Sequence, residues 1–123
     1  MKILLAEDDS NISMIAKITL EKIGRHQVTL VANGKDALDL ALKESFDVIL
    51  LDGMMPLMDG VTVLKNLKTS NMSTTPVIFL SAKSQESDIK EVLELGAIGY
   101  IQKPFEPKTL CEQIDQMLAK KAA

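Results

Sequence analysis

Five short apolar runs constrain the fold of this 123-residue chain more than any other feature. They are separated by longer stretches in which apolar residues recur at the spacing of a helix. Each run is too short for a stable helix, and several are rich in β-branched residues, which favour strands. The runs are Ile3 to Ala6, Val28 to Val31, Val48 to Leu51, Val77 to Leu80 and Ile98 to Ile101. Most are continuously hydrophobic, which is typical of strands covered on both faces. The sequence therefore predicts a five-stranded parallel sheet flanked by helices.

The stretches between these runs have the spacing of amphipathic helices. Their apolar positions are Ile12, Ile15, Ala16, Thr19 and Ile23, followed by Gly24; Ala37, Leu38 and Ala41; Val61, Leu64 and Leu67; Ile89, Val92 and Leu93, followed by Gly96; and Leu110, Ile114, Met117 and Leu118. Right-handed crossovers then place helices on both faces of the sheet, as in a doubly wound (βα)5 fold of the α/β class. We expect one domain over residues 1–123, with a frayed tail at residues 120–123.

Charge and composition exclude several classes of function. The formal net charge is −3 and no run of Lys and Arg forms a positive stripe, so we expect no direct nucleic-acid binding. The single cysteine, Cys111, cannot form an internal disulfide, which fits a reducing compartment. The start of the chain becomes acidic too early for a signal peptide, and no segment has the length of a membrane span. We therefore expect a cytoplasmic protein without membrane contact.

Residues that are polar, with one exception, follow four of the five predicted strands and should meet at one edge of the sheet. They are Glu7, Asp8 and Asp9; Asp52; Ser81 and Ala82; and Gln102 and Lys103. Crowded carboxylates repel one another unless a cation or a proton intervenes, and oxygen ligands without imidazole favour Mg²⁺ over zinc. A nearby ammonium can neutralise an incoming phosphoryl oxygen. The set therefore indicates acyl-phosphate chemistry on an aspartate nucleophile.

Each of these residues also has a purely structural explanation. Asp9 can cap the first helix, Asp52 can be an ordinary loop residue, and Ser81 can bond a turn. A single lysine such as Lys103 is most often a solvated surface residue. The prediction of a site therefore depends on the coincidence of these residues at strand ends and not on any one of them.

Four motifs resemble the response-regulator receiver domains of two-component signalling, and specifically the stand-alone CheY-like members. The motifs are KILLAEDDSNI at the start, DVILLDGMMPLMDG around Asp52, PVIFLSAK at Ser81 and GYIQKPF at Lys103. They occur in the order of the family, and the match spans the whole chain. The resemblance implies a flavodoxin-like or CheY-like fold and a signalling domain that catalyses only its own phosphorylation and dephosphorylation.

The resemblance also implies a phosphoacceptor and a metal site. Asp52 would take a phosphoryl group from a phosphohistidine of a histidine kinase or of a histidine phosphotransfer protein. Asp8 and Asp52 would bind Mg²⁺ directly, Glu7 through water, and Met54 through its backbone carbonyl. Mn²⁺ is expected to substitute for Mg²⁺.

A further set of residues would contact the phosphate and report on it. The resemblance implies that Ser81, Ala82 and Lys103 contact the phosphoryl group and that the Lys103–Pro104 bond is cis. Ser81 and Tyr100 match a switch pair, in which the hydroxyl moves toward the phosphate and the ring turns into the vacated space. The output face would consist of the fourth helix, the fifth strand and the fifth helix. It would contact a downstream protein, with the chain as a monomer or a weak dimer.

Two residues depart from the pattern of the family. Gly53 replaces the bulky apolar residue usual after the acceptor, which indicates a more mobile loop. Met54 stands where an amide or an acid can orient the hydrolytic water, and a thioether cannot do this. Met54 and Lys83 are therefore the predicted modulators of dephosphorylation, and we expect slow loss of the phosphoryl group.

Three alternative functions differ in the residues that they require. A degenerate receiver would act only as a protein-binding module and would never be phosphorylated, but this chain retains the acidic set, Ser81 and Lys103. A flavodoxin-like electron carrier would need a Ser/Thr-rich loop after the first strand and aromatic rings over the flavin. An aspartate-nucleophile phosphohydrolase would carry its nucleophile after the first strand. Phosphorelay signalling remains the favoured interpretation.

Overall fold

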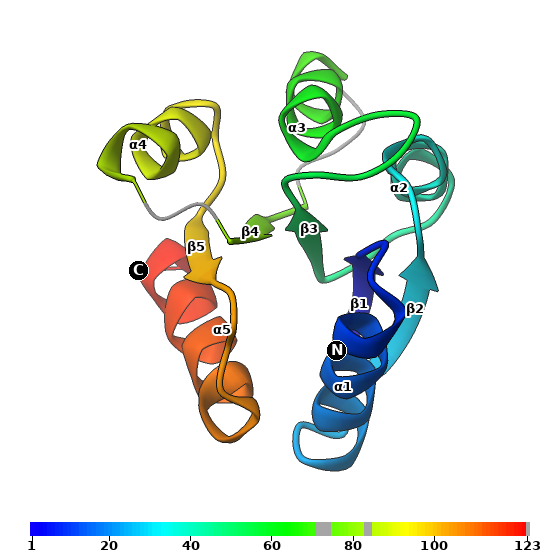
Figure 1. The fold of residues 1–123 in the computed structure, drawn as a ribbon, viewed down its shortest axis with the longest axis vertical. Coiled ribbons are helices and arrows are strands. Elements are labelled where there is room, and N and C mark those ends of the chain that lie inside the picture. The colour runs from blue at the N-terminus through cyan, green and yellow to red at the C-terminus, as the bar shows by residue number, and fades with distance from the viewer. Residues whose placement is uncertain (71–74, 83–84, 123) are drawn as a thin grey trace.

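The computed structural model describes residues 1–70, 75–82 and 85–122 and has a central parallel sheet. The strand order is β2-β1-β3-β4-β5, and every neighbouring pair is parallel. The strands are β1 (Lys2–Ala6), β2 (Gln27–Val31), β3 (Val48–Asp52), β4 (Val77–Ser81) and β5 (Gly99–Gln102), as Figure 1 shows. The predicted α/β fold with a five-stranded parallel sheet is confirmed.

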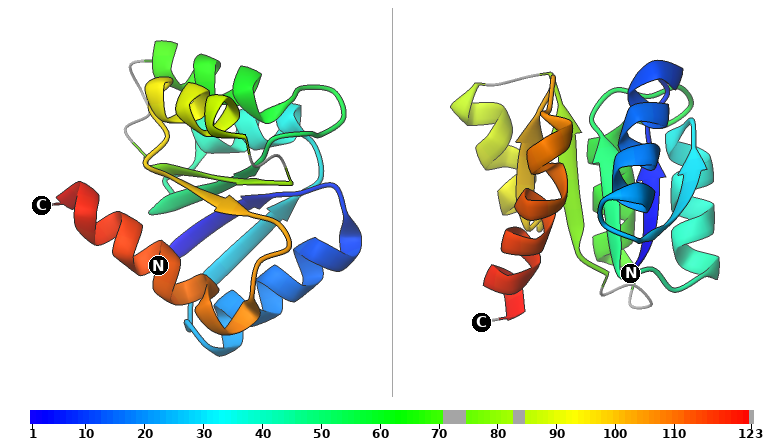
Figure 2. Two further views of the ribbon diagram at one scale, coloured as in Figure 1. Left: turned by 60° about the vertical axis from the view of Figure 1, so that its left-hand side comes forward. Right: turned by 90° about the horizontal axis from the view of Figure 1, so that it is seen from below.

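In the part of the chain that the structure describes, five helices cover both faces of this sheet. They are α1 (Ser10–Lys22), α2 (Gly34–Lys43), α3 (Gly60–Thr69), α4 (Glu86–Glu94) and α5 (Pro107–Ala122). Figure 2 shows α2, α3 and α4 on one face and α1 and α5 on the other. The helix α5 extends through Ala122, and the expected fraying at residues 120–123 stays a prediction. Lys and Ala are both strong helix formers, which favours this continuation.

The strand side chains form two apolar cores, one on each side of the sheet. In β3, Ile49 and Leu51 pack under α2, α3 and α4, whereas Val48 and Leu50 pack against α1 and α5. This alternation follows from the two-residue period of a strand. All five residues of β3 are buried, whereas the edge strand β2 is only half-buried. The continuous apolar runs therefore mark the strands that helices cover on both faces.

The predicted apolar face of α1 is only partly correct. Ala16 and Thr19 are buried, but Ile15 is 48% exposed and Ile23 is 61% exposed. The buried residues of this helix are Ser13, Ala16, Thr19 and Leu20. Ser13, Ala16 and Leu20 share one face of the helix, whereas Ile15 lies outside that face and Ile23 follows the last residue of the helix. In α4, similarly, Leu93 is exposed while its neighbour Val92 is buried.

The loop from β3 to α3 packs closely against the sheet edge and against the start of α2, at Gly60 and Gly34. The Gly60 N–H donates a hydrogen bond to the Gly53 carbonyl at 3.0 Å, and a Cβ on Gly60 would lie 2.4 Å from the Asp52 carbonyl oxygen. At the start of α2, a Cβ on Gly34 would lie 1.8 Å from the Met58 carbonyl oxygen. Both positions therefore require glycine for space, and the close contacts fix the loop beside Asp52.

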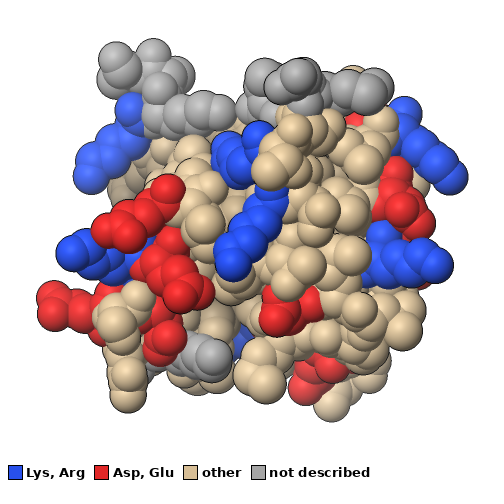
Figure 3. Space-filling view, turned by 90° about the horizontal axis from the view of Figure 1, so that it is seen from above, with Lys and Arg blue, Asp and Glu red and all other residues tan. Residues whose placement is uncertain are grey.

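Figure 3 shows the surface formed by the helices α2, α3 and α4, with acidic side chains gathered at one side. The helix α4 carries four acidic residues, namely Glu86, Asp88, Glu91 and Glu94. Two of these lie in its first turn, where a negative charge interacts favourably with the helix dipole and stabilises the helix. No helix among the described residues combines the length and the apolar character that a membrane span requires.

Candidate functional site

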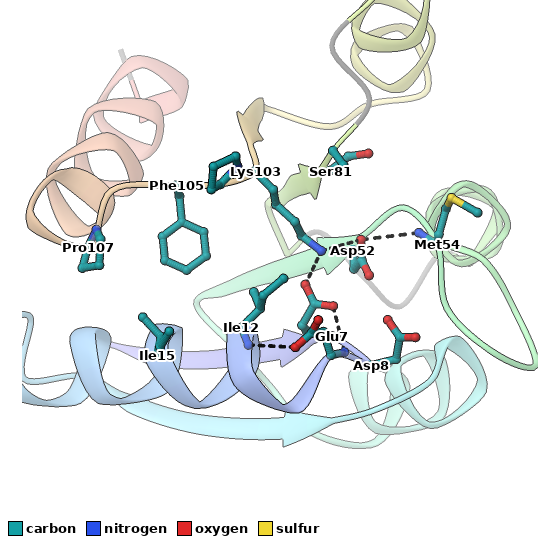
Figure 4. A pocket seen from close by; sticks show the side chains of 13 residues that line it. Glu7, Asp8, Ile12, Ile15, Asp52, Met54, Ser81, Lys103, Phe105 and Pro107 are labelled. Carbon is teal, nitrogen blue, oxygen red and sulfur yellow. Dashed lines mark hydrogen bonds and ion pairs between the residues drawn. The ribbon is translucent and has the colours of Figure 1, made fainter.

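Three carboxylates meet at the carboxyl edge of the sheet. Glu7 and Asp8 follow β1, and Asp52 ends the neighbouring strand β3. One oxygen from each of the three lies within 4.8 Å of the other two. Because β1 and β3 are adjacent and parallel, their ends lie side by side, and this brings together residues that are 45 positions apart in the sequence. Figure 4 shows the three side chains converging in one cleft.

Lys103 joins two of these carboxylates. It follows β5, and its Nζ forms an ion pair with Glu7 Oε1 and lies 3.0 Å from Asp52 Oδ1. Its side chain is only 12% exposed. Burial would lower the pKa of Lys103, but hydrogen bonds to Glu7 and Asp52 raise it above its usual value. The lysine is therefore a fixed positive charge in the site. Its peptide bond to Pro104 is cis, as the resemblance implies.

Glu7 is the most buried of the carboxylates, at 3% exposure. Its Oε2 accepts a hydrogen bond from the Asp9 N–H at 3.1 Å. Burial raises the pKa of Glu7 from 4.5 to about 7, although the hydrogen bond from Lys103 opposes this rise. The rise reflects burial, and a cation bound beside Glu7 would favour its charged form.

The donor set fits a hard divalent cation. The clustered groups are oxygen donors without imidazole or thiolate, which suits Mg²⁺ or Mn²⁺ better than zinc. Asp8 is exposed, so one side of the cluster is open to water. Mg²⁺ commonly keeps several waters and binds one or two carboxylates, which matches such an open arrangement.

Met54 and Gly53 follow the central aspartate directly. The Met54 N–H donates a hydrogen bond to Asp52 Oδ1 at 3.4 Å, and the residue is 68% exposed. The position of the loop is compatible with a role for the Met54 carbonyl as a ligand, which stays a prediction. Gly53 lies under Ser81, where a Cβ would stand 3.3 Å from Ser81 Oγ.

The structure places the other predicted residues around the same edge. Ser81 ends β4 and is buried, and Ala82 lies exposed at the rim of the cleft. Tyr100 lies in β5 opposite Phe79 and is half-buried against the core under α4. Lys83 lies outside the described residues. The expected rate modulation by this lysine therefore stays a prediction.

The sequence prediction missed an apolar wall of the site. The cleft has a volume of about 670 Å³, and four of its lining residues are Ile12, Ile15, Phe105 and Pro107. Figure 4 shows the two isoleucines of α1 facing the Phe105 ring and Pro107 across the opening. Helical spacing assigned these isoleucines to the core, because periodicity alone cannot distinguish a buried face from an apolar cleft. The residue that could have indicated this wall in the sequence was Phe105, which stands two positions after Lys103 in the motif GYIQKPF.

Comparisons with known proteins agree with this arrangement. The family described as the response regulator receiver domain matches residues 3–115. The transcriptional regulatory protein CpxR of Escherichia coli is 42% identical over 117 residues, which cover 95% of this chain and 49% of CpxR. DltR of Streptococcus agalactiae, also a transcriptional regulatory protein, is 40% identical over 114 residues, which cover 93% of this chain and 50% of DltR. The chain thus spans about half the length of these curated relatives.

Two solved structures have the same fold over nearly their whole length. The receiver domain of the Francisella response regulator 1452 is 36% identical and has a TM-score of 0.88, with 98% of both chains covered. The chemotaxis response regulator CheY4 of Vibrio cholerae is 32% identical with a TM-score of 0.87. That match covers 94% of this chain and 97% of CheY4.

Proposed function

Because the chain belongs to the family of response regulator receiver domains, we propose that Asp52 accepts a phosphoryl group from a phosphohistidine. The donor would be a histidine kinase or a histidine phosphotransfer protein. One observation carries this proposal: the buried Asp52 carboxylate lies 3.0 Å from the Lys103 ammonium and within 4.8 Å of two further carboxylates. This arrangement has a nucleophile, a place for a cation and a positive charge for the transferred group.

In the proposed reaction, an Asp52 oxygen attacks phosphorus and the bond from phosphorus to the donor imidazole nitrogen breaks. A proton taken from solvent onto the ring lets the imidazole leave as the neutral species. Glu7, Asp8, Asp52 and the Met54 carbonyl would hold Mg²⁺, or Mn²⁺ in its place. When bound, the ion would screen the carboxylates and the charge on the phosphoryl oxygens.

Lys103 and Ser81 would bind the transferred group. Lys103 already lies beside Asp52 Oδ1, so a small movement exchanges its contact with the carboxylate for one with a phosphoryl oxygen. Ser81 ends the strand next to β3, and its hydroxyl would donate to the same group. The exposed Ala82 at the rim would supply a backbone N–H.

The conformational effect of phosphorylation would be transmitted to the surface by Ser81 and Tyr100, which border a common chamber. The proposed output face consists of α4, β5 and α5, and the acidic residues of α4 favour a protein partner with complementary basic groups. We place the protein in the cytoplasm as a monomer or a weak dimer, without direct contact to nucleic acid or membrane. Its stand-alone character stays a prediction, because the chain spans about half of its curated relatives.

The test is incubation with acetyl phosphate and Mg²⁺, followed by mass measurement of the intact protein. We expect one phosphoryl group on the parent and none on Asp52→Ala or in EDTA. Asp9→Asn is the matched control, because it removes a carboxylate beside the site and keeps a good helix cap. It should be labelled like the parent. Absence of labelling on the parent would instead support a degenerate receiver, and labelling of Asp52→Ala would place the acceptor elsewhere.

A further inference from the structure

Gly53 lies directly against the Ser81 side chain. A Cβ on Gly53 would stand 3.3 Å from Ser81 Oγ, 3.7 Å from Ser81 Cβ and 3.9 Å from the ring of Phe79. The first distance is tighter than ordinary van der Waals contact. The Ser81 hydroxyl therefore occupies the border of the space that a side chain at position 53 would fill. Figure 4 shows this hydroxyl pointing away from Lys103.

Ser81 also stands between two hollows of the molecule. One is the cleft that contains Asp52 and Lys103. The other is a chamber of about 50 Å³, whose lining includes Gly53, Ser81 and Tyr100 as well as Val92 and Glu91 of α4. Because Gly53 lines this small chamber, a side chain at position 53 would reduce its volume.

We propose that Gly53 is a positioning residue for Ser81. By carrying no side chain, it lets the Ser81 hydroxyl lie toward the chamber while Asp52 is unmodified, and it keeps the chamber open beside Tyr100. A larger residue at position 53 would displace the hydroxyl from this position before any phosphoryl group arrives. The response of Tyr100 to phosphorylation would then be reduced, and this part of the inference rests on the proposed function.

The position of Ser81 can be tested without phosphorylation. We expect Gly53→Ala to change the χ1 angle of Ser81, measured by NMR couplings on the resting protein. We also expect Gly53→Ala to lower the melting temperature less in the Ser81→Ala background than in the parent, because the alanine removes the crowded oxygen. The control is the same comparison with Gly24→Ala in place of Gly53→Ala, because a Cβ on Gly24 would meet His26 and not Ser81. Gly24→Ala should lower the melting temperature equally in the parent and in the Ser81→Ala background. An unchanged χ1 together with additive melting temperatures would overturn the inference.

The response of Tyr100 is the second readout. The chain has one tyrosine and no tryptophan, so its intrinsic emission reports on Tyr100 alone. With acetyl phosphate and Mg²⁺, we expect Gly53→Val to be labelled but to lose most of the emission change that the parent shows. Equal emission changes at equal labelling, or no change in the labelled parent, would overturn the coupling role. Absence of labelling in the parent would refute the proposed function, while the NMR and melting experiments still decide the contact between Gly53 and Ser81.

Discussion

Met54 lies beside Asp52 and offers no base to a water molecule. Its amide N–H is 3.4 Å from Asp52 Oδ1, and its side chain extends into solvent. A thioether sulfur is only a weak hydrogen-bond acceptor and cannot take up a proton at neutral pH. A water that attacks the proposed acyl phosphate would therefore receive no orientation from this side chain.

We expect Met54→Asn to shorten the lifetime of the phosphoryl group by about tenfold or more, since an amide can orient the attacking water. The lifetime is measured as loss of phosphate from the purified phosphorylated protein. Met54→Leu is the matched control, because it keeps an apolar side chain of similar volume, and it should decay like the parent. A parent that loses its phosphate within seconds, or an asparagine variant that decays no faster, would contradict the role assigned to Met54.

At the scale of the elements, the helix α1 begins at the site, and its first turn depends on Asp9. The Asp9 Oδ1 accepts hydrogen bonds from the N–H groups of Asn11 at 2.9 Å and Ile12 at 3.1 Å. These bonds satisfy donors that have no partner within the helix. The Asp9 N–H in turn donates to Glu7, so the cap and the carboxylate cluster share a residue.

We expect Asp9→Ala to lower the free energy of unfolding by roughly 1 kcal/mol, the usual contribution of an N-cap. Urea denaturation measures this loss. Asp9→Asn should lose only a small part of it, because asparagine caps helices about as well as aspartate. If both variants lose the same amount, the charge of Asp9 and not its capping bonds would be responsible.

The elements could be predicted well because their determinants are local. Each predicted strand ends within one residue of the observed one, and the strand ends correctly indicated where Glu7, Asp8, Asp52 and Lys103 would meet. The direct pairing of Lys103 with Glu7 could not be predicted, because it depends on side-chain conformers across two strand ends. The exposure of Ile15 was also missed, since apolar residues lie on more than one side of α1 and their spacing alone does not show which side faces the sheet.

At the scale of the whole molecule, Glu7 links the site to stability. Burial raises its pKa from 4.5 to about 7 in the absence of metal. Between these two pH values the folded protein binds more protons than the unfolded chain does. The contribution of Glu7 is therefore fully present below pH 4.5 and is lost as the pH rises through about 7.

In EDTA, we expect the stability of the parent relative to Glu7→Gln to fall as the pH rises from 4.5 to 7. Urea denaturation of both proteins across this range gives the difference, in which the other titrating groups largely cancel. Glu86→Gln, at an exposed position of α4, should show no such trend relative to the parent. A difference that is flat or rises with pH would mean that Glu7 is ionised throughout.

The pairing of Lys103 with the acidic cluster also has a consequence for ion selectivity. When all four groups are ionised, the three clustered carboxylates and the Lys103 ammonium carry a formal charge of −2. One divalent ion restores electroneutrality, whereas Na⁺ or K⁺ leaves an excess negative charge in a partly buried volume. Once Glu7 is ionised, charge balance therefore favours a doubly charged ion over a singly charged one, before the size of the ion is considered.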